Sequence, residues 1–395
     1  MRYAAITDRL AGLGGAKWEI HARARAMMAA GVEVLALTIG EPDQPPPPEL
    51  LARACDAMAA GRIGYSNGRG EPGLLAALAA RYSRRCGRAI GPNQIIALPG
   101  TQTAMFAALT ALVGPGDEVL VGDPMYATYE GVIASTGATM VAVPLRAEHG
   151  FRMQVADVVA RVTPATRVLF LNTPHNPTGA VLTREDVQAL GRIARQHDLW
   201  ILSDEVYEEL VFAGSTFASP LDQAELAERT IVVSSISKSH AAPGFRSGWC
   251  ISPGEFSSRL LPVAETMLFG NQPFIADMTA LAVSKPSVVA REMTQRFAGR
   301  AQLIHAALEG RNDLRVHQPQ AGMFTVIDIR ATGLSGTDYA RMLLDQEHVA
   351  VMPGESFGQS LAGWVRVSLT RPDAELTEAC TRIAAFTARQ IGRDR

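Results

Sequence analysis

The feature that most constrains the fold is an alternation of short apolar runs with amphipathic stretches between about residues 94 and 252. Such an alternation is typical of a mostly parallel sheet whose two faces are covered by helices. The expected helices are 101–113, 126–134, 156–162 and 184–196. The expected strands are 94–98, 118–121, 140–143, 168–171, 200–202, 231–233 and 248–251.

After about residue 286 the pattern changes, and long helices mix with short strands as in a smaller α+β domain. A short strand near Val34 would most simply complete that domain. We therefore expect an α/β protein with an N-terminal arm and part of the small domain (1–45), a large domain (46–285) and a C-terminal small domain (286–395). Helices are expected at 288–308, 336–347 and 374–391, and strands at 323–328, 349–352 and 365–369.

Composition excludes several classes of protein. The 395 residues can bury a large core, and a net charge of −2 gives no reason to expect nucleic acid or an anionic membrane as a partner. The N-terminus lacks the apolar core of a signal peptide, and no apolar run is long enough to span a bilayer. Four scattered cysteines without C-x-x-C spacing predict neither a metal site nor a disulfide framework, so a reducing cytoplasm fits.

Lys238 is one of only three lysines in a chain that otherwise uses arginine. An ammonium can lose its proton and form an imine, whereas a guanidinium effectively cannot. The apolar run before it would place Lys238 just past a strand's C-terminal end, where open α/β sheets bind ligands. Ser235, Ser237 and Arg246 supply hydroxyls and N–H donors suited to a phosphate. The hypothesis is a Schiff-base lysine beside a phosphorylated aldehyde, pyridoxal phosphate; the plain alternative is a surface lysine on a polar turn.

A second interpretation of the same segment is a serine acyl-enzyme. Residues 235–238 match S-x-x-K, the signature of penicillin-recognising serine enzymes. Those enzymes also need S-D-N and K-T-G, but Ser203-Asp204 is followed by Glu205 and no lysine here precedes Thr-Gly. The motif should also open a helix rather than follow a buried strand. This interpretation is kept as a remote alternative.

Loops at the other expected strand ends carry polar residues that the aldehyde cofactor could use. Gly100, Thr101 and Gln102 lie between a strand and a helix, where backbone N–H groups and the helix dipole make an anion site. Tyr126 follows the next strand and could stack on a flat ring. Asn176 follows strand 168–171 and can donate a hydrogen bond to an oxygen.

Asp204 and Tyr207 follow the strand at 200–202. A carboxylate there could pair with a pyridinium nitrogen and keep it protonated, which makes the ring an electron sink. Tyr207 could donate to the phenolic oxygen of the ring. Each loop alone also fits a plain polar turn, but their co-occurrence, in an order that ends on a rare lysine, is not easily explained otherwise.

Four motifs together closely resemble the class I/II aminotransferases of fold type I, the aspartate aminotransferase superfamily. They are Asn-Pro-Thr-Gly at 176–179, Asp204-x-x-Tyr207, Ser235-x-x-Lys238 and Arg246-x-Gly at 246–248. The resemblance covers nearly the whole chain. It implies a fold type I pyridoxal-phosphate transferase that moves an amino group from an L-amino acid to a 2-oxo acid. It also implies a homodimer whose active sites are shared across the interface.

The resemblance implies roles for the residues named above. Lys238 would hold the cofactor and then act as general base, while Asp204 keeps the ring nitrogen protonated and Tyr207 tunes the phenolic oxygen. Arg366 resembles the arginine that clamps the substrate α-carboxylate, a task that suits a bidentate guanidinium. Gly40 and Asn176 would also contact substrate. The cofactor would be held by Gly100, Thr101, Gln102, Tyr126, Asn176, Ser235, Ser237 and Arg246, with Tyr65 from the other subunit.

Within the superfamily, the segments at 18–21, 124–130 and 237–241 are most similar to arginine:pyruvate aminotransferases. Aspartate or aromatic aminotransferases that use 2-oxoglutarate are the alternatives, because Phe245 and the segment at 269–274 depart from the family pattern. A lyase or oxidase on the same fold would share every cofactor residue. A regulatory module would need a DNA-binding segment, for which the 395 residues leave no room. We also hypothesise that Glu19 pairs with a substrate guanidinium; a solvated helix charge is the alternative.

Overall fold

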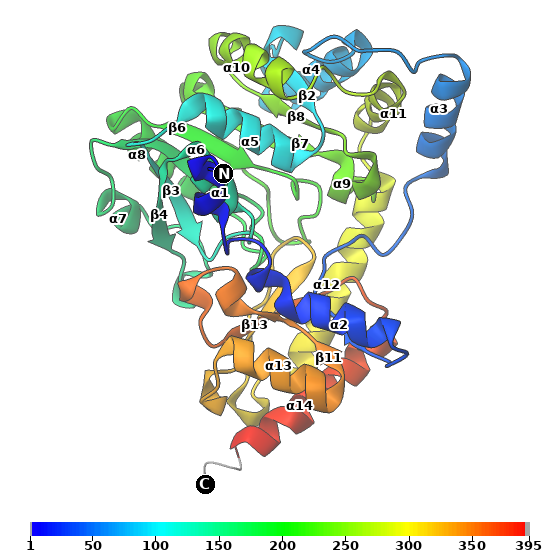
Figure 1. Ribbon diagram of the computed structural model, residues 1–395, viewed down its shortest axis with the longest axis vertical. Coiled ribbons are helices and arrows are strands. Elements are labelled where there is room, and N and C mark those ends of the chain that lie inside the picture. The colour runs from blue at the N-terminus through cyan, green and yellow to red at the C-terminus, as the bar shows by residue number, and fades with distance from the viewer. Residues whose placement is uncertain (1, 392–395) are drawn as a thin grey trace.

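The computed structural model describes residues 2–391, and its centre is a seven-stranded sheet with helices on both sides (Figure 1). The strands are β2 (Ile95–Leu98), β3 (Glu118–Asp123), β4 (Thr139–Pro144), β5 (Thr166–Asn172), β6 (Trp200–Asp204), β7 (Thr230–Ser235) and β8 (Gly248–Ile251). Their order across the sheet is β2-β8-β7-β6-β5-β3-β4. Neighbours pair in parallel except at β8, which is antiparallel to both β2 and β7. The predicted α/β class and all seven predicted strands are therefore present.

The central strands contain continuous apolar runs because both faces of the sheet are covered. Ile231, Val232 and Val233 of β7 are fully buried, although successive side chains point to opposite faces. The four helices predicted between the strands all form. The covering helices are α3 (Pro48–Ala59), α4 (Pro72–Cys86), α5 (Thr101–Leu112), α6 (Tyr129–Thr136), α7 (Val155–Val159), α8 (Arg184–Gln196), α10 (Gly254–Met267) and α11 (Pro273–Val283).

Helix boundaries differ from the prediction where local signals conflict. Helix α6 begins at Tyr129, three residues later than predicted, so Tyr126 lies in the loop before it. Helices α10 and α11 were not predicted. Pro262 lies inside α10 and would normally interrupt a helical pattern. Helix α11 is mostly apolar and largely buried, so it shows little amphipathic period.

A smaller unit contains the C-terminal strands and helices together with the beginning of the chain. Its antiparallel sheet has the order β12-β13-β10-β9, and a separate parallel pair joins β1 to β11. The strand predicted at 349–352 thus divides between two sheets. The strands are β1 (Leu35–Ala36), β9 (Arg315–Val316), β10 (Phe324–Asp328), β11 (Val349–Ala350), β12 (Met352–Pro353) and β13 (Trp364–Ser368).

The N-terminal arm shares the core of this smaller unit, as its pairing with β11 requires. Ile20, Ala24 and Leu37 belong to the same buried cluster as the helices α12 (Val288–Leu308), α13 (Gly336–Glu347) and α14 (Asp373–Ile391). Figure 1 shows α2 (Glu19–Ala29) beside α13 in the lower part of the molecule, with α12 extending from the upper part into it. The arm thereby brings residues 37–41 to the junction of the two units.

Three further observations concern membranes, metal ions and disulfide bonds. Within residues 2–391, no helix combines the length and the apolar character that crossing a membrane requires. In the same residues, His, Cys, Asp and Glu side chains form no group of three or more that could hold a metal ion. All four cysteines are free thiols.

Candidate active site

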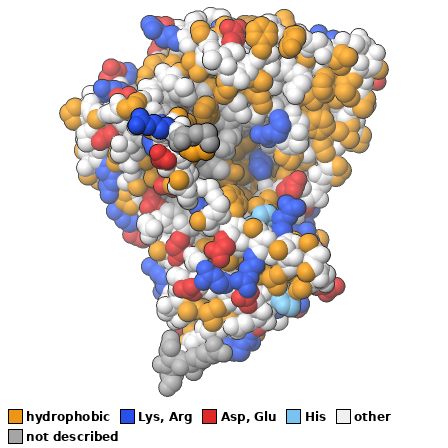
Figure 2. Space-filling model, in the orientation of Figure 1, with side chains coloured by type: hydrophobic (Ala, Val, Ile, Leu, Met, Phe, Trp, Pro, Cys, Tyr) orange, Lys and Arg blue, Asp and Glu red, His pale blue; other side chains and the backbone are white. Residues whose placement is uncertain are grey.

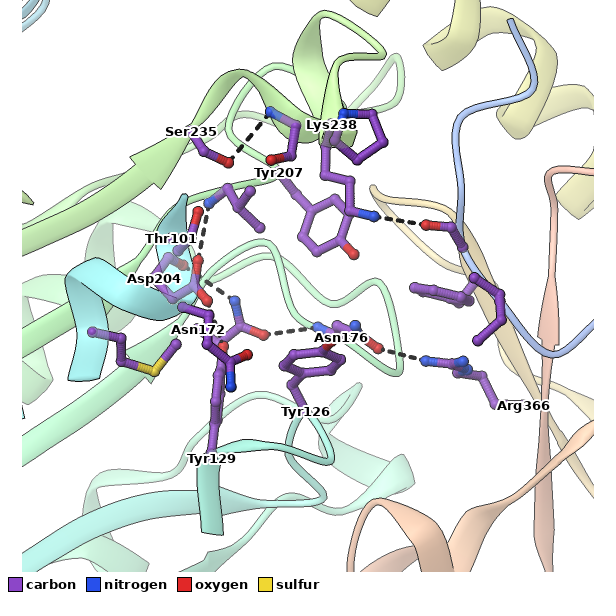
Figure 3. Close-up of a pocket in the computed structure, with 18 of the residues that line it drawn as sticks. Thr101, Tyr126, Tyr129, Asn172, Asn176, Asp204, Tyr207, Ser235, Lys238 and Arg366 are labelled. Carbon is purple, nitrogen blue, oxygen red and sulfur yellow. Dashed lines mark hydrogen bonds between the residues drawn. The ribbon is translucent and has the colours of Figure 1, made fainter. Parts of the chain in front are cut away.

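A cavity of about 230 Å³ lies where the C-terminal ends of the parallel strands meet the smaller unit. All of the residues predicted for the site line it except Gly100 and Tyr65. Figure 2 shows this face hollowed between the upper and lower parts of the molecule, with basic side chains at the edge of the hollow. In the close-up, Lys238 enters from above, Asp204 lies on one side and Arg366 on the other (Figure 3).

Lys238 is placed by a single helical turn, α9 (Ile236–Ser239), that directly follows β7. The Ser235 hydroxyl caps this turn by accepting a hydrogen bond from the Ser237 N–H at 3.3 Å. The Lys238 Nζ donates to the Gly40 carbonyl oxygen at 2.6 Å. Burial lowers the pKa of Lys238 to about 8, against a raising contribution from Glu41. The amine is therefore much closer to neutrality at physiological pH than an ordinary lysine.

Asp204 ends β6 and is buried beneath the cavity. The Tyr129 hydroxyl donates to Asp204 Oδ2 at 2.7 Å, and the Val206 N–H donates to Oδ1 at 3.1 Å. Burial raises the pKa of Asp204 to about 6, and these two hydrogen bonds keep it from rising further. Within the described chain no cationic side chain forms a salt bridge with this carboxylate, so the site is suited to a positively charged group from elsewhere.

Asn172 organises the loop that carries Asn176. The Asn172 side chain accepts from the Asn176 N–H at 2.9 Å and donates to the Asp204 carbonyl oxygen at 3.1 Å. These bonds join the ends of β5 and β6, which are neighbours in the sheet. Asn176 is thereby fixed with its side-chain oxygen toward Arg366 (Figure 3).

Arg366, in β13, is only 1% exposed. Its Nη1 donates to Asn176 Oδ1 at 3.0 Å and its Nη2 to the Thr38 carbonyl oxygen at 2.6 Å. The guanidinium carbon lies 3.8 Å from the ring centre of Phe324 and 4.3 Å from that of Phe357. The pKa of Arg366 is lowered by burial, and no carboxylate of the described chain pairs with it. A bound carboxylate would supply the missing negative charge.

A set of hydrogen-bond donors surrounds the start of α5. Gly100 caps this helix with a φ of 87°, and a Cβ there would overlap the Arg246 guanidinium. The first N–H groups of a helix have no intrahelical acceptor. Arg246 donates to the carbonyl oxygens of Pro243 and Pro99 at 2.9 and 3.3 Å, and the Thr101 hydroxyl is buried without a partner among the described residues. Together with Ser235 these groups form a cradle for an anion.

Two tyrosines complete the polar lining. Burial is the main cause that raises the pKa of both Tyr126 and Tyr207, so both phenols stay protonated at neutral pH and can donate. In Figure 3 the Tyr126 ring lies between the Asp204 side and the Arg366 side of the cavity. Tyr126 also contacts Tyr129 edge to face, with ring centres 5.7 Å apart.

Two predicted residues lie elsewhere. Tyr65 is 93% exposed and contacts Phe269 edge to face, with ring centres 6.1 Å apart, so it does not reach the cavity of its own chain. The hypothesis for Glu19 needs correction: its carboxylate does not line the cavity and instead lies 3.6 Å from Nη2 of Arg341.

Several lining residues were not predicted from the sequence. Most are apolar, and an apolar residue gives no chemical signal in a motif. Tyr129 and Asn172 are polar, but their bonds to Asp204 join positions 75 and 32 residues apart. The unpredicted lining residues are Trp18, Ile39, Met105, Tyr129, Asn172, Val206, Pro243 and Phe324.

The family model described as aminotransferase class I and II matches residues 32–383. This chain belongs to that family. Arginine–pyruvate transaminase AruH of Pseudomonas aeruginosa is 42% identical to this aminotransferase over 99% of this chain and all of its own. The aspartate aminotransferase of Streptomyces avermitilis is 33% identical over 92% of this chain and 91% of its own. A double mutant of Thermus thermophilus aspartate aminotransferase has a TM-score of 0.91 at 30% identity, covering 98% of this chain and 100% of its own.

The aminotransferase has the fold type I architecture and depends on pyridoxal phosphate, moving an amino group from an L-amino acid to a 2-oxo acid. The side chains of the cavity fit the cofactor. They offer an amine of lowered pKa, a buried carboxylate without a cation and an anion cradle. Thr101 Oγ1 and Arg366 Nε are buried and have no hydrogen-bond partner within residues 2–391, which suits a bound phosphate and carboxylate, respectively.

Family membership overturns the remote serine acyl-enzyme alternative. The local structure of residues 235–238 nevertheless differs from the prediction made for this segment. The segment at 235–238 follows a buried strand, as predicted, and it also opens a short helix, with Ser235 as the cap. The two local structures are compatible because the chain turns sharply at the end of β7.

Proposed function

We propose that this aminotransferase moves the α-amino group of L-arginine to pyruvate. The observation that carries the proposal is the charge of the cavity lining. Among the described residues of one chain, the cationic side chains in the lining are Lys238, Arg246 and Arg366, and the roles proposed for them below leave none of these three for the second carboxylate of aspartate. The similarity to arginine–pyruvate transaminase AruH supports the same substrate pair.

The remaining lining suits a long side chain that ends in a cation. Trp18 lines the cavity, and aromatic faces attract guanidinium groups. Glu41 stands beside Gly40 and is close enough to Lys238 to raise its pKa. Its carboxylate therefore adds negative charge near the cavity.

Lys238 is the residue that would bind the cofactor and then act as the base. When bound, pyridoxal phosphate supplies an aldehyde carbon that takes up the amino group and an electron-withdrawing ring that weakens the substrate Cα–H bond. The Lys238 Nζ, with a pKa of about 8, accepts the proton from Cα. An amine of this pKa is unprotonated often enough at neutral pH to act as a base.

Other residues would orient the reactants. Asp204 would pair with the protonated ring nitrogen, while Asn176 and Tyr207 donate to the phenolic oxygen and Tyr126 stacks on the ring. Arg366 holds the substrate α-carboxylate, and Gly40 forms part of the same wall. The phosphate would be held by Gly100, Thr101, Gln102, Ser235, Ser237 and Arg246.

A donor panel tests the substrate pair. Purified enzyme is assayed with arginine, lysine, alanine, aspartate and phenylalanine, each against pyruvate and 2-oxoglutarate, and both the new 2-oxo acid and the aminated acceptor are quantified. We expect the highest kcat/KM for arginine with pyruvate. A tenfold preference for aspartate or phenylalanine with 2-oxoglutarate would replace the arginine proposal by the aspartate or aromatic alternative.

We also propose a homodimer in which Tyr65 reaches the phosphate bound by the other subunit. Tyr65, Ile63 and Phe269 are large apolar side chains with more than half of their surface exposed, which favours burial against a partner. Sedimentation should give the mass of two chains. Mixed dimers of Lys238→Ala and Tyr65→Ala chains, formed by unfolding and refolding together, should regain activity. Their failure to do so would contradict a shared site.

The domain division and the location of the enzyme are part of the same proposal. The pairing of β1 with β11 supports assigning residues 1–45 to the arm and part of the small domain, with 46–285 and 286–395 as the large domain and the C-terminal small domain. The four free thiols support a cytoplasmic location, where reducing conditions keep cysteines unpaired.

A further inference from the structure

Asp123 ties the large sheet to a loop of the smaller unit. It ends β3, and the N–H of Ser360 donates to both of its carboxylate oxygens at 3.3 Å. Nearby, the Met125 N–H donates to the Phe357 carbonyl oxygen at 2.8 Å. These bonds join segments more than 230 residues apart in the sequence. They bring the loop at 354–361 against the end of β3.

The fit between Asp123 and this loop is close. A Cβ on Gly358 would overlap Asp123 Oδ1, and the φ of Gly358 is +142°, which side chains rarely adopt. Within the described chain, the carboxylate is bonded to loop N–H groups and forms no salt bridge. The loop is therefore the binding partner of Asp123, and glycine at 358 permits the approach.

Phe357 connects this contact to the substrate side of the cavity. It is almost completely buried, and its ring packs against the Arg366 guanidinium, as does the ring of Phe324. The backbone of Phe357 is fixed between the Met125 bond and the Ser360 bond. A shift of the loop would move the Phe357 ring and leave the Arg366 guanidinium packed against Phe324 alone.

We propose that Asp123 is a positioning residue that seats the loop at 354–361 so that Phe357 holds Arg366 in place for the substrate α-carboxylate. The inference rests on the role proposed for Arg366. Because Asp123 acts on carboxylate recognition, its loss affects every amino acid substrate alike. The binding of pyridoxal phosphate, which uses other residues, is not affected.

The test combines two variants that disturb the contact from opposite sides. Asp123→Ala removes the carboxylate, and Gly358→Ala places a methyl group against it. In both we expect KM for arginine and for alanine to rise about tenfold, with kcat changed less than threefold. Gly116→Ala is the matched control, because Gly116 has a φ of +95° but no atom within 4 Å of an added Cβ. It should leave both constants unchanged.

Two non-reacting probes separate carboxylate recognition from the rest of the site. For 5-guanidinopentanoate, which keeps the carboxylate, we expect the inhibition constant to rise about tenfold in both variants. For butylguanidine, which is 5-guanidinopentanoate without the carboxylate, it should stay the same. The dissociation constant of pyridoxal phosphate from the cofactor-free proteins, measured by fluorescence, should also stay the same. If Asp123→Ala does not fold, Asp123→Asn and Gly358→Ala provide the comparison.

If the wild-type protein is an active transaminase, either of two results would overturn the inference. One is an unchanged KM in folded Asp123 and Gly358 variants. The other is an equal loss of affinity for butylguanidine, 5-guanidinopentanoate and the cofactor, which would indicate general damage to the fold. If the wild-type protein transaminates other donors but not arginine, the substrate proposal fails, and the comparison of KM values with alanine still tests Asp123.

Discussion

Replacing Asp204 by asparagine should stabilise the cofactor-free enzyme and weaken its binding of pyridoxal phosphate. Burial raises the pKa of Asp204 from 3.8 to about 6. Because the pKa of Asp204 is higher in the folded than in the unfolded protein, protonation of Asp204 stabilises the fold. This stabilisation is fully present below pH 3.8 and is lost as the pH rises through about 6. The resulting cost of ionised Asp204 is about 2 kcal/mol at pH 5 and about 3 kcal/mol at pH 8. Asparagine has the same shape and does not ionise.

Urea unfolding of the cofactor-free proteins, at one fixed protein concentration and at pH 5 and pH 8, measures this effect. We expect the free energy of unfolding of Asp204→Asn, relative to wild type, to increase by about 1 kcal/mol from pH 5 to pH 8. The matched control is Asp198→Asn, because the side chain of Asp198 is 97% exposed. Its difference from wild type should change less between the two pH values than that of Asp204→Asn.

The same variant tests the functional side of the argument. Without a carboxylate to face the ring nitrogen, its affinity for pyridoxal phosphate, measured by fluorescence titration at pH 8, should fall by roughly tenfold or more. The reasoning is refuted if the stability difference is the same at both pH values, or if Asp204→Asn is less stable than wild type at pH 8.

Three further variants or conditions test neighbouring groups. The rate at which the cofactor-free enzyme captures pyridoxal phosphate should rise with pH and level off above about pH 8, because the pKa of Lys238 is lowered to about that value; a rise continuing to pH 10 would contradict this. Arg366→Lys keeps the charge but loses the paired donors and the stacking between Phe324 and Phe357. Its kcat/KM for arginine should fall roughly 100-fold, equivalent to about 2.7 kcal/mol, and a loss below threefold would count against the clamp. Tyr129→Phe removes a hydrogen bond to the buried Asp204 carboxylate, worth about 1.5–3 kcal/mol, so the pKa of Asp204 should rise further. The pH dependence of cofactor affinity should then move upward by about one to two pH units, and an unchanged profile would be inconsistent with this account.

Much of the fold could be predicted because its signals are local. Buried parallel strands such as 231–233 are apolar throughout, and their spacing indicates the crossover helices. Helix α8 has its capping residues, Thr183 and Asp186, in the sequence itself. Helix α11 lacked such signals because most of its residues are apolar. The strand predicted at 349–352 divided in two because β11 and β12 pair with different partners, β1 and β13, which local sequence does not reveal.

For the site, residues with distinctive chemistry were predictable and the residues that support them were not. Lys238 is a rare amine at a strand end, and Asn176 lies in a short motif. Tyr129, Phe357 and Asp123 act through contacts with residues distant in sequence, and the same side chains are common in ordinary loops. Glu19, in contrast, was predicted to contact the substrate but does not line the cavity. Its charge suggested a substrate contact, but Arg341 lies beside it once the arm packs against α13.

The most direct test of the central claim is to identify the residue that carries the cofactor. The holoenzyme is reduced with borohydride, digested and examined by mass spectrometry. Since the chain has only three lysines, each can be assigned to its own peptide. The account predicts one phosphopyridoxyl group, on Lys238. A modified Lys17 or Lys285 with unmodified Lys238, or no adduct in an enzyme that transaminates, would contradict it.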